Sequence, residues 1–280
     1  MKRLTKVCLI LVVVFLGIGI LLAVVGTAMG FRFGNIRDIS GLTNLTKQEK
    51  YEYPLEEIKN LDIKVDAGKL EINSGDEDKI VVIMKRKDDY GTCYQDGNKL
   101  VIHEKLKKSF WKLFENYGTE VKIYLPKDYK FEKGRITMGA GEANIERFYG
   151  KEISFDVGAG SLHGDTIAAA EKMELSAGAG EIDIEKMQAK DTSVECGVGS
   201  ISLSGKVDGD ISADCGIGEI SLDLDGKEND FNYILKSGVG DMEINDNKFH
   251  ALGNDKKIDH NAKKTINMEC GVGSIDVNVN

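Results

Sequence analysis

Residues 194–203 read VECGVGSISL, and this short stretch decides the fold. Apolar residues alternate with polar ones as far as Val198, in the middle of a Gly-Val-Gly word, and the alternation resumes at Ile201 one residue out of phase. Apolar alternation with period two predicts β-strands. A slip of one residue turns every following side chain to the other face, so the chain must bend at the glycines if both strands face one interior.

The same word, Gly-x-Gly followed by Glu, Ser or Asp, occurs seven times in the second half of the chain. Its first glycines are 19, 20, 19, 19, 22 and 33 residues apart. Units repeated every ~20 residues are typical of solenoids, because one unit cannot bury its apolar side alone. The last interval contains one unit and a polar insertion within 245–264. The predicted corners are Gly139, Gly141, Gly158, Gly160, Gly178, Gly180, Gly197, Gly199, Gly216, Gly218, Gly238, Gly240, Gly271 and Gly273.

These observations predict an all-β fold, a single-stranded parallel β-solenoid with regular coils over residues 136–280. Residues 63–72 carry the same alternation around a single glycine, and strands are expected near 79–86, 99–104 and 120–125. We therefore interpret 55–135 as irregular N-terminal coils and a cap. The final residues 277–280 read as a strand, which leaves an open sheet edge that needs protection.

The fourth position of the word reads Glu, Ser, Glu, Ser, Glu, Asp, Ser along the chain. Units stacked in register at ~4.8 Å would place this position in one outward column. Like charges on adjacent rungs repel, and the sequence largely alternates a carboxylate with a hydroxyl. This alternation favours stacking in register, although the step from Glu219 to Asp241 breaks it.

The chain has 280 residues, 32 glycines, two prolines and a net charge of −9. The charge is uneven, at +5 over residues 1–50, zero over 51–135 and −14 over 136–280. We do not expect nucleic-acid binding, because it depends on a basic face that neutralises phosphates and this chain is acidic.

The amino end predicts a membrane segment. Residues 7–29 carry no charge and follow Lys2, Arg3 and Lys6. Such a stretch spans a bilayer as one helix, and the basic cluster keeps residues 1–6 in the cytoplasm. Residues 30–54 then form a linker to an extracytoplasmic domain, which predicts a single-pass protein of the bacterial cell membrane. A cleaved signal peptide is the alternative, with Gly26 and Ala28 as small residues near a cleavage site.

The membrane segment, the opening at 63–72, the strand ending Ile123-Tyr124-Leu125-Pro126 and the Gly-x-Gly repeats resemble the bacterial “putative adhesin” β-strand-repeat family, a domain of unknown function. The resemblance covers residues 55–280. It implies a single-stranded parallel β-solenoid on membrane-anchored or extracytoplasmic proteins, and a role in surface adhesion. It supplies no catalytic residues. The 33-residue interval and an insertion at 105–117 depart from the simplest repeat.

Outside the repeats, residues 105–114 have the sequence KLKKSFWKLF, which is rich in lysine and aromatic residues. A short helix here would carry an apolar stripe flanked by lysines, which fits contact with an anionic membrane or a partner. The alternative is a plug over the first coil. The candidate contact residues are Lys105, Lys107, Lys108, Phe110, Trp111, Lys112 and Phe114.

Other chemistry-bearing residues carry weaker patterns. Cys196, Cys215 and Cys270 share one repeat position and are expected as buried side chains in a line, not as a tetrahedral metal site. The four histidines share no spacing with a nucleophile, and Gly-x-Gly alone is not a nucleotide-binding motif. Acidic residues recur once per coil, so neither a glycosidase pair nor a calcium repeat stands out. These acids are Glu142, Glu181, Glu219, Asp241, Asp156, Asp183, Asp223 and Asp276.

The sequence therefore predicts a membrane-anchored, extracytoplasmic interaction or adhesion module without catalysis or cofactor. Its expected partners are the membrane, through the N-terminal helix, and an envelope protein or surface glycan. Two alternatives remain at this stage. One is an accessory protein of a system that senses cell-envelope stress, and the other is a carbohydrate-active β-helix enzyme.

Overall fold

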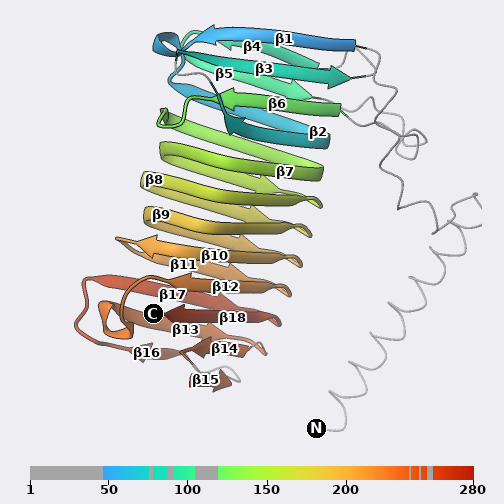
Figure 1. Cartoon of the computed structure of the whole chain (residues 1–280). Helices are drawn as coiled ribbons and strands as arrows, with labels where there is room; N and C mark the ends of the chain where they lie inside the picture. The colour runs from blue at the N-terminus through green and yellow to red at the C-terminus, as the bar shows by residue number, and fades with distance from the viewer. Residues whose placement is uncertain are drawn as a thin grey trace, which may run out of the picture. The chain divides into compact units, whose positions relative to one another are not determined.

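A computed structural model describes residues 47–75, 78–86, 91–104, 119–239, 241–245, 247–250 and 255–280, all within a unit that begins at Asn44. Most of these residues lie in β-strands that wind into stacked rungs (Figure 1). The prediction of an all-β, solenoid-like fold is confirmed. No helix among the described residues is long and apolar enough to cross a membrane. The predicted membrane segment at 7–29 lies outside the described residues.

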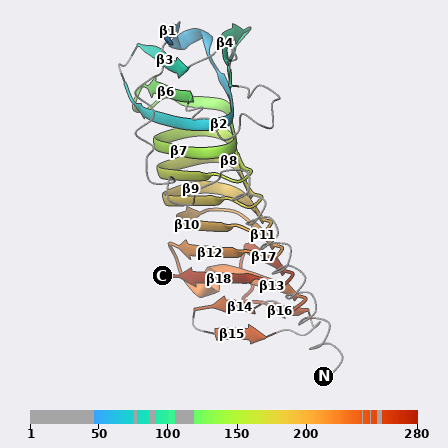
Figure 2. The same cartoon turned by 90° about the vertical axis from the view of Figure 1, so that its right-hand side faces the viewer.

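The middle of the stack consists of regular coils, each with three short sides. Strand pairing between neighbouring coils runs in register over three segments, for example 161–164, 166–169 and 172–177 against the next coil. The corners lie along the right-hand side of the stack in Figure 1 and face the viewer in Figure 2. The strands of this part are β7 (Lys130–Val157), β8 (Ser161–Ala177), β9 (Glu181–Cys196), β10 (Ser200–Val207), β11 (Ile211–Cys215) and β12 (Glu219–Leu224).

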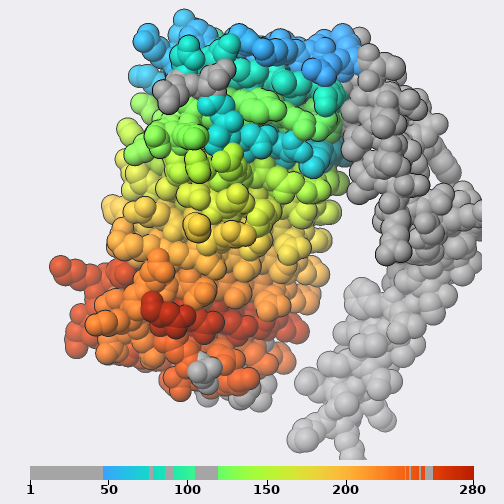
Figure 3. All heavy atoms as spheres, viewed as in Figure 1, coloured from blue at the N-terminus to red at the C-terminus, as the bar shows by residue number. Residues whose placement is uncertain are grey.

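The carboxyl end does not stack in chain order. Strand β17 pairs in parallel with both β11 and β13, and β18 pairs in parallel with both β12 and β14. The last coil of the sequence is therefore inserted beneath β11 and β12, and the coil that precedes it in the chain lies further out. Figure 3 shows the dark red last strand between orange layers. These strands are β13 (Phe231–Ser237), β14 (Asp241–Ile244), β15 (Asn247–His250), β16 (Lys256–Ile258), β17 (Lys264–Cys270) and β18 (Ser274–Val279).

The prediction that the last strand of the chain forms an open sheet edge is therefore wrong. Val277 pairs with Leu222 on one side and with Ile244 on the other. The outermost strands β13 and β14 are instead paired in antiparallel fashion with β16 and β15, which come from the polar insertion. The insertion covers the end of the stack, so the last coil can occupy an interior position.

The amino end is rearranged in a similar way. Strand β2 lies between the coil formed by β5 and β6 and the first part of β7, although it precedes both in the chain. Strands β1, β3 and β4 add in antiparallel pairs, β3 on β6, β1 on β3 and β4 on β5. Their bounds are β1 (Lys47–Pro54), β2 (Asn60–Ser74), β3 (Lys79–Arg86), β4 (Gly91–Asp96), β5 (Lys99–Glu104) and β6 (Thr119–Leu125).

The prediction of a single-stranded parallel solenoid thus needs correction at both ends. Parallel rungs form the body, while antiparallel strands close it. An exposed parallel edge would offer unpaired N–H and C=O groups to other chains, and antiparallel hairpins reduce this exposure with short connections. Single 3₁₀ turns at Leu55–Glu57 (η3) and Glu228–Asp230 (η5) lie beside these end regions.

One apolar core runs through the whole stack, from Ile58 to Val279. Isoleucine, leucine and valine dominate it, as alternation predicts. Aromatic rings also pack within this core, where the Phe148 ring centroid lies 5.3 Å from that of Phe131 and 5.9 Å from that of Phe155. Each such buried apolar side chain contributes ~1.5–3 kcal/mol relative to exposure.

Candidate functional site

The paired glycines are required by the close approach of neighbouring corners. A Cβ atom on Gly199 would lie 1.8 Å from the carbonyl oxygen of Gly180, and one on Gly273 would lie 1.9 Å from that of Gly218. The amide of Val198 donates to the Gly178 carbonyl at 2.7 Å, so the corners themselves are hydrogen bonded from rung to rung. Most of the predicted corner glycines lie in bends between strands, whereas Gly139 and Gly141 lie within β7 and Gly240 lies outside the described residues.

The residue between the two glycines points outward, contrary to the continuous inward alternation expected through it. Val198 and Ile217 are each 63% exposed, Val272 is 61% exposed and Val239 is 69% exposed. The alternation holds up to the residue before the first glycine, which is buried wherever its side chain is described, as at Cys196. The bend turns the middle residue outward. The inward alternation therefore ends at the residue before the first glycine and not at the residue between the two glycines.

These four side chains lie on consecutive rungs. The amides of Ile217, Val272 and Val239 donate to Gly197, Gly216 and Gly271, each at 2.8 Å. We call this row, Val198, Ile217, Val272 and Val239, the corner ridge. Towards the amino end the equivalent residues Ala140, Ala159 and Ala179 are also exposed, but they are short.

The column at the fourth position is more regular in space than along the chain. Ser274 lies between Glu219 and Asp241, in register with both. The insertion of the last coil therefore removes the break in the alternation. Across the parallel strands the column runs Glu120, Lys69, Glu142, Ser161, Glu181, Ser200, Glu219, Ser274, Asp241.

The column before the first glycine is buried. Cys196, Cys215 and Cys270 are adjacent in it, because the inserted coil places Cys270 directly beside Cys215. All three are free thiols and less than 5% exposed. Burial, followed by the two neighbouring sulfurs, raises the pKa of Cys215 to about 12. These thiols are poor nucleophiles at neutral pH, since the thiolate is the reactive form.

Glu104 occupies the same column at the amino end and was not predicted from the sequence as a buried residue. It lies in register with Val65 and is 5% exposed. Its carboxylate accepts hydrogen bonds from the amides of Asp66 at 3.0 Å and Ala67 at 3.2 Å, and from the Thr119 hydroxyl at 3.2 Å. Burial is the largest effect on the Glu104 carboxyl and raises its pKa, although these hydrogen bonds act in the opposite direction. The sequence did contain one sign of its burial, because Glu104 continues the two-residue spacing of the apolar residues Leu100 and Ile102.

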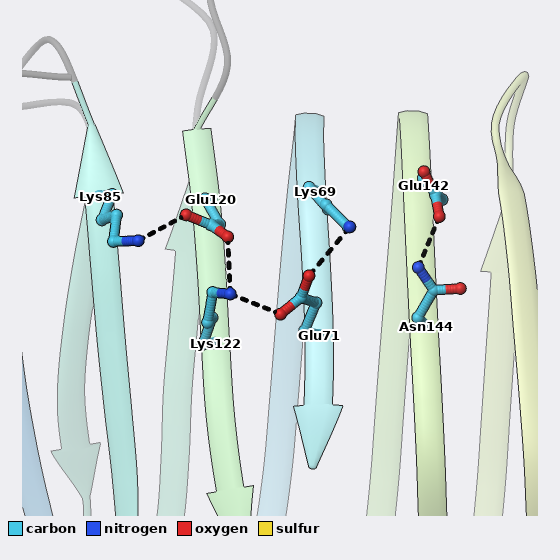
Figure 4. Close-up of polar contacts among 7 residues, drawn as sticks. All are labelled: Lys69, Glu71, Lys85, Glu120, Lys122, Glu142 and Asn144. Carbon is cyan, nitrogen blue, oxygen red and sulfur yellow. Dashed lines mark hydrogen bonds and ion pairs between the residues drawn. The ribbon is translucent and has the colours of Figure 1, made fainter. Parts of the chain in front are cut away.

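Charged side chains at the amino end form a paired network on the outer face (Figure 4). Lys122 contacts Glu71 at 2.8 Å and Glu120 at 2.9 Å, while Lys69 contacts Glu71 and Lys85 contacts Glu120, both at 2.9 Å. The hydrogen bond from Lys122 is the largest effect on Glu71 and lowers its pKa. This network joins β3, β6 and β2.

The remaining candidates do not converge on one site. His163 contacts Asp183 through Nδ1 at 3.0 Å and Asp165 through Nε2 at 3.2 Å, on the outer face. The His260 ring lies against Tyr233, and its Nδ1 lies 2.9 Å from the Phe231 carbonyl oxygen. Among the described residues, no group of three or more His, Cys, Asp or Glu side chains is placed to hold a metal ion.

The basic segment lies outside the described residues, so its predicted membrane or partner contacts stay predictions. This applies to Lys105, Lys107, Lys108, Phe110, Trp111, Lys112 and Phe114.

Comparison with known proteins decides the family. A model of the family described as Toastrack DUF4097 matches residues 58–278. The chain belongs to this Toastrack family. The match begins after β1 and spans the other antiparallel end strands as well as the regular coils. It confirms the resemblance to a bacterial β-strand-repeat domain of unknown function. No curated protein is detectably similar in sequence.

Several solved structures are similar to this Toastrack chain at low identity. A “putative cell adhesion protein” from Clostridium sporogenes is 18% identical, with 84% of this chain and 99% of that chain covered and a TM-score of 0.35. A “putative adhesin” from Bacteroides fragilis is 13% identical, with 83% and 97% covered and a TM-score of 0.36. A “putative lipid binding protein” from Parabacteroides distasonis is 18% identical, with 82% and 96% covered and a TM-score of 0.44.

Proposed function

We propose that this protein is a non-catalytic interaction module at the bacterial cell surface, anchored by residues 7–29 with the solenoid outside the membrane. The observation that carries the proposal is the repetition of outward side chains along a rigid stack. The corner ridge presents apolar side chains on consecutive rungs, and the fourth-position column alternates carboxylates with serines over its carboxyl half. Such columns suit binding to a partner that is long enough to contact several rungs.

The placement of the acidic residues supports a binding role over glycoside hydrolysis. Glu181 and Glu219 are separated by the Ser200 rung, and both are exposed at equivalent positions. A glycosidase requires two carboxyl groups in different environments, one of which keeps a proton at neutral pH. Equivalent positions on a repeating face provide similar environments, which favours a surface charge pattern.

Anchoring and orientation are tested together on cells that produce the full chain with a C-terminal epitope tag. We expect the tag to remain with the membrane after carbonate washing, to be released by detergent, and to be removed by protease added outside intact cells. A tag that is released into the medium would support the cleaved signal peptide instead. A tag protected from external protease would contradict the proposed orientation.

Adhesion is tested on the same cells. Cells that lack the protein should adhere less to immobilised cell-wall glycan or to neighbouring cells, and the full chain should restore adherence. A variant lacking residues 55–280 but retaining the anchor is the matched control. Equal adherence of all three strains would contradict an adhesive role.

A further inference from the structure

The corner ridge is an unusual surface for a protein exposed to water. Among the described residues, its four side chains and Tyr94 are the large hydrophobic residues that are most exposed. Isolated exposed apolar residues are common, whereas a contiguous row indicates a contact surface. Valine and isoleucine are also stiff at χ1, so the ridge loses little side-chain freedom when it is covered.

Two shallow troughs run beside the ridge, because the glycines on either side have no side chains. One trough is lined by Gly180, Gly199 and Gly218 with the serines and glutamates of the fourth position. The other is lined by Gly178, Gly197 and Gly216 with residues before the corner. The ridge therefore stands between two depressions that can receive side chains of a partner.

Acidic side chains border both troughs. Glu181 and Glu219 line the first, and Glu195, Asp214 and Glu269 line the second. Asp214 lies in register with Glu195 on one side and Glu269 on the other, so three acidic residues occupy successive rungs. Partial burial and then the charge of Glu269 raise the pKa of Asp214. Lys236 contacts Glu269 at 4.0 Å on the next rung, and a cationic partner would offset the acidic charge that remains at Glu195 and Asp214.

The charge excludes several partners for this surface. A second copy of the ridge carries the same acidic borders and would be repelled, as would an anionic lipid surface or a nucleic acid. The favoured partner has an apolar stripe with basic residues on both sides.

The spacing of the rungs selects the conformation of that partner. Rungs repeat every ~4.8 Å, while side chains on one face of an extended strand repeat every ~6.7 Å. Apolar residues at i, i+3 and i+7 of a helix are on average ~5.3 Å apart, given a rise of ~1.5 Å per residue. A helix therefore matches the ridge more closely than a strand does. Basic residues seven apart, at ~10.5 Å, also approach the ~9.6 Å between alternate rungs.

We infer that the corner ridge binds an amphipathic helix of a partner protein, with its apolar stripe along Val198, Ile217, Val272 and Val239 and its lysine or arginine side chains over the flanking troughs. This inference rests on the proposed interaction function and names the partner's chemistry. Binding is confined to the carboxyl half of the stack, where the ridge residues are long enough to contact the helix.

The test uses the full chain in phosphatidylcholine nanodiscs and a fluorescent 21-residue peptide with leucine at heptad positions a and d and lysine at e and g. Empty nanodiscs provide the blank. We expect saturable binding by anisotropy that weakens as salt is raised. The same peptide with glutamate in place of lysine should bind at least tenfold more weakly.

Two sets of substitutions locate the site. The combined variant Val198→Thr, Ile217→Thr, Val272→Thr and Val239→Thr keeps β-branched side chains at exposed positions and should bind the peptide at least tenfold more weakly. The combined variant Glu195→Gln, Asp214→Asn and Glu269→Gln should bind more weakly and lose most of its salt dependence. The control Glu142→Gln with Asp156→Asn, at the alanine end of the same face, should bind as the unchanged protein does. Circular dichroism verifies that each variant is folded.

Unchanged binding by the threonine variant, or equal binding of the lysine and glutamate peptides, would overturn the inference. Its failure is separable from failure of the proposed function. If cells with the threonine variant adhere like the wild type, the ridge is not the contact site, although the module remains adhesive. If the peptide binds but cells with and without the protein adhere equally, the ridge is confirmed as a helix-binding surface and adhesion is contradicted.

Discussion

The two ends of the stack differ in how their charged surface residues are arranged, although both consist of stacked rungs. At the amino end, Glu71, Glu120 and Lys122 lie on adjacent strands and form ion pairs across β2 and β6. In the carboxyl half, Glu219 and Asp241 are separated by the hydroxyl of Ser274. Neighbouring rungs are ~4.8 Å apart, so like charges in one column repel unless they are paired or spaced. Paired charges leave a neutral surface, whereas spaced carboxylates leave an acidic one available to a partner.

The largest expected effect comes from removing the inserted coil. A chain that ends at Lys263 lacks β17 and β18, so β13 and β14 lose their parallel partners while β8 and β9 keep theirs. Hydrogen exchange should show loss of protection over 231–258 and retained protection over 161–196.

The control for this truncation is Asn278→Ser, at an exposed position of β18. It should leave exchange unchanged. Equal protection of 231–258 in the full and shortened chains would contradict the interior position of the last coil.

The next effect concerns the corners. Gly199→Ala places a methyl group against the Gly180 carbonyl, whereas Gly178→Ala has 3.0 Å to the nearest atom, the Gly158 carbonyl oxygen. We expect the free energy of unfolding to fall by about 3 kcal/mol for Gly199→Ala and by about 1 kcal/mol for Gly178→Ala, because overpacking against rigid backbone is costly. Urea denaturation measures both. Equal losses would show that backbone freedom, not close approach, requires these glycines.

A smaller effect is expected at Glu104, which fills the cysteine column at the amino end. Glu104→Ala leaves the amides of Asp66 and Ala67 without their acceptor, which should lower the free energy of unfolding by about 2 kcal/mol. Glu104→Gln retains an acceptor oxygen and should cost less. Chemical denaturation at pH 7 distinguishes them, and a glutamine variant as unstable as the alanine variant would contradict this role.

The smallest effect is a pH response of opposite sign at the two ends. Hydrogen bonding by Lys122 lowers the pKa of Glu71, so its stabilisation is present above its ordinary pKa and is lost as the pH falls through the folded value. Burial, and then Glu243 and Glu219, raise the pKa of Asp276, so its contribution is present below its ordinary pKa and is lost as the pH rises through the folded value.

Acidification from pH 7 to pH 4 should therefore reduce hydrogen-exchange protection of β2 and β6 relative to β12 and β18, after correction for intrinsic exchange rates. Lys122→Met should diminish the response at the amino end, because Glu71 loses its main cationic partner. Changes of the same sign and size at both ends would refute the distinction between paired and spaced charges.

Much of the fold could be predicted from the repeats. The words at Gly197 and Gly216 correctly predicted corners stacked in register, and the alternation around Ile201 predicted the buried residues. The outward direction of Val198 was not predicted, because period-two alternation continues through it and only the geometry of the bend reverses its side chain. Glu104 was missed because an acidic residue in a strand is normally exposed, and its amide donors come from a distant segment.

The sequence by itself determined most of the coil: most of the residues that face inward, where the chain bends, and that glycine is needed at the bends. Local periodicity and the size of a side chain are sufficient for these features. The order of the coils was decided only by the tertiary structure. Every parallel rung offers nearly the same backbone hydrogen-bonding edge, so local sequence does not specify which rung lies next to which. Pairing of β18 with both β12 and β14 places Ser274 between Glu219 and Asp241, while β15 and β16 close the end of the stack.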